Sequence, residues 1–110
     1  MPHMVKEVKG SLFWMSKTPL KVGERVVLKC STQEVACTVR GIERRIDSST
    51  LEVLEEGAKV LENREVGEVV LSFSTALIVE DFNTTPELGR FVVEKDYTIS
   101  GGGIITHLGG

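Results

Sequence analysis

The sequence has no long hydrophobic run. Its longest apolar stretches contain about four residues, whereas a helix needs about 20 predominantly apolar residues to cross a membrane. The first ten residues carry charges and lack the apolar segment of a secretory leader. We therefore predict a cytoplasmic protein with no membrane partner. The 110 residues, 41% hydrophobic and 26% charged, suit one globular domain, which we place at 9–110 after a linker at 1–8.

Cysteine is nearly absent, with two residues in the chain. Cys30 and Cys37 flank a turn-like segment at 31–34, and a hairpin turning there would place Cys30 opposite Val35 rather than opposite Cys37. Two cysteines do not make the disulfide framework of a small secreted protein. The sequence therefore predicts two reduced, half-buried thiols.

Histidine is equally scarce, which argues against catalytic and metal-binding sites that depend on imidazole groups. His3 and His107 lie near opposite ends of the chain, and neither has a cysteine or histidine at metal-ligand spacing. His107 is the one credible imidazole base, and it has no partners for a nucleophilic triad. The chain also lacks a P-loop, because the glycine run at 101–103 is followed by Ile104 and not by lysine. We predict that this chain is not an enzyme and that it holds no cofactor and no metal ion.

The three glycines at 101–103 allow two interpretations. Consecutive glycines can expose backbone N–H groups to an anion. They can also let one backbone pass close to another, or turn sharply, where a side chain would clash. We favour the close approach or turn, because no lysine stands where it could balance a phosphate charge.

Positive charge is not in excess. Lys and Arg total 13 against 16 Asp and Glu, which gives a net charge of −3 and a pI of about 5.4. Because non-specific nucleic-acid binding depends on a positive field, this balance argues against a nucleic-acid partner. Arg40, Arg44 and Arg45 nevertheless form a local cluster, in which alternation would put Arg45 on the face opposite the other two. The cluster is either a solvated strand face or a docking patch for an acidic partner or for phosphates.

Aromatic residues make up only 5% of the chain. Binding of single-stranded RNA by stacking needs exposed aromatic side chains among the basic ones. Phe13, Trp14, Phe73 and Phe91 lie instead in apolar runs, so we predict that they belong to the core.

What the sequence does contain is a succession of short strand patterns. Val35, Cys37 and Val39 alternate with their neighbours in the way typical of a strand with one buried face. The alternation slips near Gly41, where we predict a bulge or bend. Strands that recur about every ten residues, with turn residues between them, favour an all-β antiparallel barrel or sandwich. The predicted strands are 11–15, 25–30, 35–42, 67–73, 76–79, 90–94, 97–99 and 104–107.

The segment 49–65 is ambiguous. Its apolar residues recur at the spacing of an amphipathic helix, but Gly57 would lie inside that helix at a cost of about 1 kcal/mol. The residue pattern leaves a helix and an extended segment open. The residues at helical spacing are Leu51, Leu54, Ala58 and Leu61.

Several motifs occur in the order found in a known family. Phe13-Trp14-Met15, Pro19-Leu20-x-x-Gly23 and Leu28-Lys29-Cys30-Ser31-Thr32 resemble the start of the last β-barrel of elongation-factor-Tu-like GTPases. More narrowly, they resemble the GTPase subunit of bacterial sulfate adenylyltransferase. The resemblance covers residues 9–108. The further motifs that carry it are Ala36 through Ile42, Arg45-Ile46-Asp47 with Thr50-Leu51-Glu52, Leu61 through Val69, Gly89-Arg90-Phe91-Val92, and Tyr97 through Ile105.

The resemblance implies a fold. It points to a closed six-stranded antiparallel Greek-key barrel. It also implies that 49–65 is a long, mostly extended crossover anchored on the barrel by Leu61, which favours the extended alternative over the helix. A closed barrel leaves no free sheet edges, and this suits a module whose role is interaction.

The resemblance also implies a role. In that family a GTPase domain, which carries the P-loop, the switch regions and the guanine-specificity motif, precedes two barrels and binds GTP with Mg²⁺. None of those motifs occurs in this sequence. The chain is therefore expected to be a non-catalytic C-terminal barrel of a sulfate-activation GTPase. Its expected partners are the GTPase domain and second barrel of the parent chain, or the catalytic adenylyltransferase subunit that makes adenylyl sulfate.

Two other functions are weighed beside this one. In elongation factor Tu the equivalent barrel helps to hold tRNA, so an RNA-contacting barrel is the alternative. A stand-alone enzyme or ligand-binding barrel would need a pocket with converging polar groups, and the sequence offers no candidates for it. For the interaction role, the candidate partner-interface residues are Arg40, Arg44, Arg45 and Arg90, the last being either an ion-pair donor or solvated.

Overall fold

The computed structural model describes residues 3–30, 32–79 and 89–109. None of the described residues forms a helix that is long and apolar enough to span a membrane. The strands in these ranges are β1 (His3–Trp14), β2 (Leu20–Lys21), β3 (Arg25–Cys30), β4 (Gln33–Asp47), β5 (Val53–Ala58), β6 (Val60–Leu61), β7 (Glu65–Val79), β8 (Arg90–Lys95) and β9 (Thr98–Leu108).

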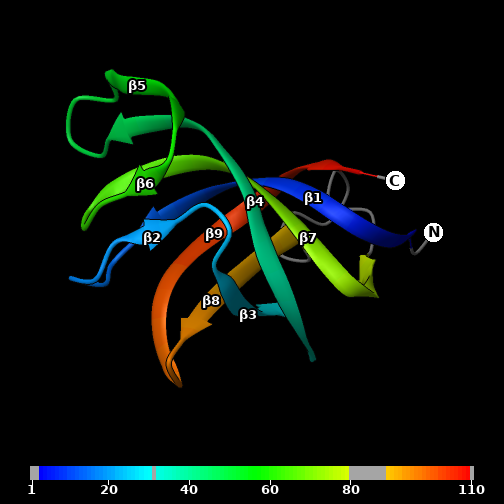
Figure 1. The fold of residues 1–110 in the computed structure, drawn as a ribbon. Coiled ribbons are helices and arrows are strands. Elements are labelled where there is room, and N and C mark those ends of the chain that lie inside the picture. Colours follow the sequence, from blue (N-terminus) through cyan, green and yellow to red (C-terminus); the bar gives the residue numbers. More distant parts are fainter. Residues whose placement is uncertain (1–2, 31, 80–88, 110) are drawn as a thin grey trace.

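Six of these strands close into a barrel (Figure 1). The neighbours run in the order β3-β8-β9-β1-β7-β4, and an additional pairing between β3 and β4 closes the ring. All pairings are antiparallel. The prediction of a closed six-stranded antiparallel barrel is confirmed. Strand β5 pairs with β4 outside the ring, and β2 pairs with β6 as a separate two-stranded sheet.

Alternation along the strands builds the core. In β3 the side chains of Val26, Leu28 and Cys30 point inward between more exposed neighbours. The predicted irregularity near Gly41 is confirmed, because the register of β4 against β7 shifts between Val39 and Gly41. The fully buried side chains are Trp14, Leu12, Leu20, Leu28, Leu61, Leu71, Leu77, Val8, Val39, Val69 and Val93.

The start of the domain is corrected by the structure. Residues 1–8 were expected to be a linker, but β1 begins at His3 and pairs with β7 from there. Val5 and Val8 are both buried. They lie three residues apart because the register shifts between Val5 and Glu7. This bulge breaks the period of two and hides the first half of the strand from pattern analysis.

The cysteine hairpin is tighter than expected. Cys30 lies opposite Gln33 and not Val35, while Cys37 lies opposite Val26. Neither cysteine forms a disulfide, as predicted, and both are buried more deeply than predicted. Burial raises the pKa of the Cys37 thiol to about 12.

Two further expectations are wrong in detail. Trp14, Phe73 and Phe91 are buried as predicted, but Phe13 points outward and is 37% exposed, because it follows the inward Leu12 in β1. Some predicted strands are also parts of longer ones. Strand β7 runs without a break through 67–73 and 76–79, and β9 runs through the three glycines.

The segment 49–65 is extended. It contains β5 and β6 and no helix, as the resemblance implied. Leu61 is fully buried and pairs with Leu20 of β2, which anchors the segment on the barrel. Leu51 and Leu54, which suggested a helical face, are exposed. Strand β5 and residues 42–47 of β4 form what we call the β4–β5 arm, which lies at the end of the molecule away from both termini in Figure 1.

Candidate functional site

The strand register places two of the candidate arginines in one row on the outer face of the barrel. Arg44 lies opposite Glu56 on one side and Glu68 on the other, and the row continues across β1 and β9 to Arg90 of β8. Four strand spacings separate the two arginines, or about 19 Å along the surface. The row consists of Glu56, Arg44, Glu68, Ser11, Ile104 and Arg90.

Ion pairs fix Arg44 within this row. Its Nε lies 2.8 Å from Oε1 of Glu56, and its Nη1 lies 2.5 Å from Oε2 of Glu68. The hydrogen bond to Glu56, followed in size of effect by the hydrogen bond to Glu68, raises the pKa of the Arg44 guanidinium. The arginine therefore ties β5, β4 and β7 together, and its charge is balanced by two carboxylates.

Arg45 makes the equivalent contacts on the other face of β4. Its Nε lies 3.3 Å from Oε1 of Glu55, and its Nη1 lies 2.6 Å from Oε2 of Glu65. This face leads into the barrel interior, because Arg45 lies opposite Gly67, which pairs with the buried Leu12. The two arginines thus clamp the arm from both faces.

The other two candidates are less constrained. Arg40 is exposed and falls at the first register shift of β4, so it has no direct partner on β7. Arg90 is exposed at the start of β8. No hydrogen bond or ion pair joins either guanidinium to another described residue. The structure therefore spreads the four arginines over the outer and inner faces of β4 and one end of β8, rather than over one patch.

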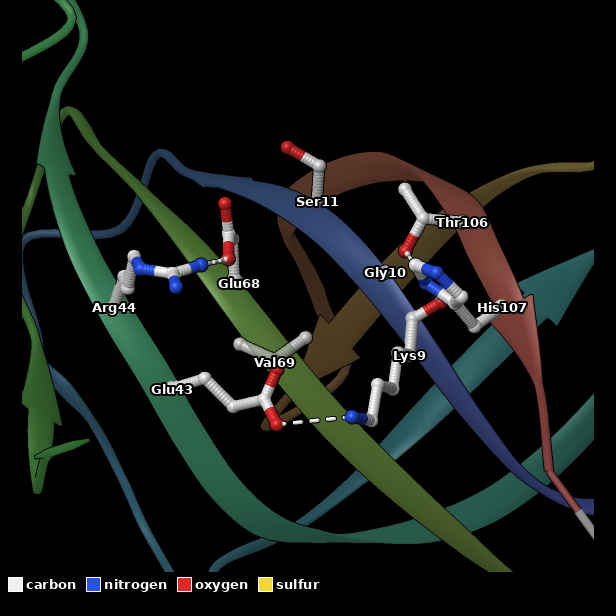
Figure 2. A pocket seen from close by; sticks show the side chains of 9 residues that line it. All are labelled: Lys9, Gly10, Ser11, Glu43, Arg44, Glu68, Val69, Thr106 and His107. Carbon is white, nitrogen blue, oxygen red and sulfur yellow. Dashed lines mark hydrogen bonds and ion pairs between the residues drawn. The ribbon is translucent and has the colours of Figure 1, made fainter. Parts of the chain in front are cut away.

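A hollow of about 490 Å³ lies next to the charged row, over β1, β4, β7 and β9 (Figure 2). Lys9 Nζ forms an ion pair with Glu43 Oε2 at 3.0 Å across its floor. Arg44 and Glu68 form a second pair at its rim. The hollow therefore presents alternating charges that already satisfy one another.

One histidine belongs to this hollow. His107 Nδ1 lies 3.1 Å from Thr106 Oγ1, and that hydroxyl in turn donates to the backbone oxygen of Lys9 at 3.2 Å. Thr106 is thus committed to the backbone and is not an activated nucleophile. Across 3–30, 32–79 and 89–109 no three His, Cys, Asp or Glu side chains come together as a metal site.

The β8–β9 hairpin carries a surface residue that the sequence analysis did not single out. Tyr97 is 99% exposed. Asp96 and Tyr97 both have positive φ angles, of 53° and 64°, as the tight turns of two-residue hairpins require. The usual Asn-Gly signal of such a turn is absent here, which explains why the motif was missed.

The turn of the β4–β5 arm depends on Asp47. Its Oδ1 accepts the backbone N–H groups of Ser49 at 2.8 Å and Thr50 at 2.9 Å. The hydrogen bond from the Thr50 backbone, followed in size of effect by the one from Ser49, lowers the pKa of Asp47 from its ordinary value of 3.8. Because the folded-state pKa is lowered, this stabilisation is present above the ordinary value and is lost as the pH falls through the lowered one.

We expect NMR titration of the Asp47 carboxyl carbon to give a midpoint below 3.8. We also expect amide exchange at Ser49 and Thr50 to accelerate, relative to the intrinsic rate, below that midpoint. Asp47→Asn keeps an acceptor oxygen but cannot titrate, so it removes the pH dependence. A midpoint at or above the ordinary value would contradict this assignment.

With this geometry in hand, comparison with known proteins identifies the family. The family model described as "GTP-eEF1A C-terminal domain-like" matches residues 7–106. The chain belongs to this family. This match confirms the resemblance to elongation-factor-type GTPases that the sequence motifs indicated.

Two kinds of protein illustrate what this GTP-eEF1A C-terminal domain-like chain is similar to. Sulfate adenylyltransferase subunit 1 of Tolumonas auensis is 29% identical over 111 residues, which cover 98% of this chain and 23% of the relative. Elongation factor 1-alpha of Natronomonas pharaonis is 30% identical over 88 residues, which cover 79% of this chain and 21% of the relative. The chain therefore spans less than a quarter of the length of these two relatives.

A solved structure supports the fold of this GTP-eEF1A C-terminal domain-like barrel. Sup35 complexed with GDP superimposes on 98% of this chain and 26% of the Sup35 chain, with a TM-score of 0.87. The sequence identity is 14%, so the likeness speaks for the barrel architecture alone.

Proposed function

We propose that the chain is the C-terminal barrel of a sulfate adenylyltransferase GTPase subunit, and that it acts by docking rather than by catalysis. The observation that carries the proposal is the alignment with sulfate adenylyltransferase subunit 1, which extends over 98% of the chain. The alignment with elongation factor 1-alpha of Natronomonas pharaonis covers 79%. GTP and Mg²⁺ would bind to the GTPase domain of the parent protein and not to these residues.

The proposed docking partners are the GTPase domain and second barrel of the parent, or the catalytic adenylyltransferase subunit. Arg40 and Arg90 support a docking role, because their exposed guanidinium groups are not committed to another described residue. Arginines of this kind can form bidentate contacts with carboxylates of a partner. Arg44 and Arg45 support it in a different way, since they hold the β4–β5 arm in place.

Isothermal titration calorimetry tests this function. The chain is titrated with the catalytic adenylyltransferase subunit of the same organism, and separately with the parent GTPase domain joined to its second barrel. We expect saturable binding to one of them, weakened about tenfold by Arg40→Ala or Arg90→Ala. Lys17→Ala, which removes an exposed charge from a connecting segment, is the matched control. Absence of binding to both, or saturable binding of GTP by the chain alone, would refute the proposal.

An RNA-contacting barrel is the second candidate, favoured by the 30% identity with elongation factor 1-alpha. The ion pairs Lys9–Glu43 and Arg44–Glu68 speak against it, because their carboxylates cancel the positive charge of the outer face. Titration with tRNA at 50 and 200 mM salt separates the two functions. Affinity that falls steeply with salt would favour the RNA-contacting barrel, and no binding at the lower concentration would remove it.

A further inference from the structure

The outer edge of β5 has no strand beside it in the described part of the chain. β5 is the last strand in the sheet order, and β4 is its one partner there. Residues Val53 to Gly57 are exposed, and residues 53–58 contain neither proline nor lysine, which commonly protect sheet edges. The edge therefore presents backbone N–H and C=O groups that can pair with another extended segment.

Charged side chains of alternating sign follow one another across the neighbouring strands, and this alternation ends at β5. On the outer face the charges alternate in the order Glu68, Arg44, Glu56 and end with a carboxylate at the edge. On the other face Arg45 is followed by Glu55 at the same edge. A basic residue on the next strand would continue the alternation on each face.

An apolar row runs beside the charged one. Val53 of β5 lies opposite Ile46, which lies opposite Val66, which in turn lies opposite Phe13 of β1. Val53 is 52% exposed at the open end of this row. An apolar side chain on an added strand would cover Val53 and extend the row by one strand.

The charge around the arm agrees with a basic partner. Residues 43–68 contain eight of the 16 acidic residues of the chain but only four of its 13 basic residues. Glu52, beside β5, is exposed and its carboxylate makes no ion pair with a described residue. The negative charge of the protein is thus concentrated where the sheet edge is open, and this steers cationic segments to it.

We propose that β5 accepts an extended segment of a partner protein as an additional antiparallel strand, and that this segment carries two consecutive basic residues followed by an apolar one. Strand β4 shows the pattern, since its Arg44-Arg45-Ile46 lies opposite Glu56, Glu55 and Val53. The partner segment occupies the other side of β5 in the same orientation as β4. Its backbone supplies the hydrogen bonds, and its three side chains continue the rows on both faces.

A second copy of this chain does not fit the same edge. Two β5 strands can pair antiparallel about a two-fold axis. The register that pairs all six residues then places Glu55 of one copy opposite Glu56 of the other. Like charges directly opposite one another are unfavourable, so the edge selects a cationic segment over itself.

Peptide binding to the 110-residue chain tests the proposal. The probe is a fluorescein-labelled nine-residue peptide with an Arg-Arg-Ile centre flanked by alternating threonine and valine. A second peptide has a Glu-Glu-Ile centre and is otherwise identical. By fluorescence anisotropy we expect saturable binding of the basic peptide and at least about tenfold weaker binding of the acidic one. By NMR we expect amide exchange of residues 53–56 to slow about tenfold or more when the basic peptide is bound.

A pair of double variants checks which charges are used. Glu55→Gln with Glu56→Gln is expected to weaken binding of the basic peptide about tenfold. Glu34→Gln with Glu62→Gln removes two exposed charges outside β5 and is expected to leave the affinity within about twofold. Glu55 and Glu56 also form ion pairs with Arg45 and Arg44, so amide exchange of residues 53–56 in the free variants verifies that β5 stays paired with β4, and circular dichroism verifies that the barrel is folded. No binding, equal binding of both peptides, unchanged exchange in β5, or equal effects of the two double variants would overturn the proposal.

Discussion

Gly103→Ala is expected to lower the free energy of unfolding by about 3 kcal/mol or more, enough to threaten the folded state. A Cβ at this position would lie 2.0 Å from the backbone oxygen of Ser11 and 3.0 Å from the Cα of Leu12. Both atoms belong to the backbone of β1, which pairs with β9 at this point. Since no flexible side chain can move aside, the two strands would have to separate. Urea unfolding followed by circular dichroism measures the loss.

The adjacent glycine supplies the control. A Cβ at Gly102 would lie 3.7 Å from the backbone oxygen of Phe91 and 3.9 Å from Cγ1 of Val92, which are ordinary contacts. Gly102→Ala is therefore expected to change the free energy of unfolding by less than about 1 kcal/mol. Equal losses in the two variants would contradict the close approach. Of the two interpretations of the glycine run, the structure supports the close approach, with Gly103 as the residue that needs it.

Trp14→Ala is expected to cost about 3–5 kcal/mol, as for other large aromatic side chains removed from a core. Trp14 is fully buried, and its Nε1 donates a hydrogen bond to the backbone oxygen of Thr18 at 2.8 Å. The variant therefore opens a cavity and also leaves a partly buried carbonyl without its donor. For a domain of this size the melting temperature should fall by roughly 12 °C or more, measured by circular dichroism.

Two further variants separate the contributions of Trp14. Trp14→Phe keeps most of the apolar volume but loses the N–H, so an intermediate loss is expected. Phe13→Ala removes the neighbouring aromatic ring, which is 37% exposed, and should cost clearly less than Trp14→Ala. A loss from Phe13→Ala as large as that from Trp14→Ala would show that the inward and outward assignments of β1 are wrong.

The parts of the fold that sequence reasoning predicted are those with an undisturbed period of two. Strand β3 and the first half of β4 each bury one face, so their alternation is visible in the sequence. The first half of β1 was missed because a bulge places Val5 and Val8 three residues apart. Strand β9 was cut short because glycines have no side chains and give no periodic signal. Closure of the ring came from the family resemblance and not from the pattern.

The candidate site was predictable only in its residue types. The sequence points to Arg44 and Arg45 as a basic cluster, and strict alternation correctly puts them on opposite faces of the strand. Their carboxylate partners come from β5 and β7, 10 to 24 residues away along the chain. Register shifts in β4 decide which glutamate meets which arginine, and no local rule fixes these shifts in advance.

The position of β1 between β7 and β9 has a consequence for folding during synthesis. Gly10 pairs with Val69 on one side and with Ile105 on the other. During synthesis β1 is made before both of its neighbours, so neither of its edges can be paired until β7 has followed. Barrels dominated by such distant pairings fold in milliseconds to seconds. Until β7 has been made, the side chains of Leu12 and Trp14, which are fully buried in the folded barrel, have no complete core to enter, and exposed apolar surface of this kind favours aggregation.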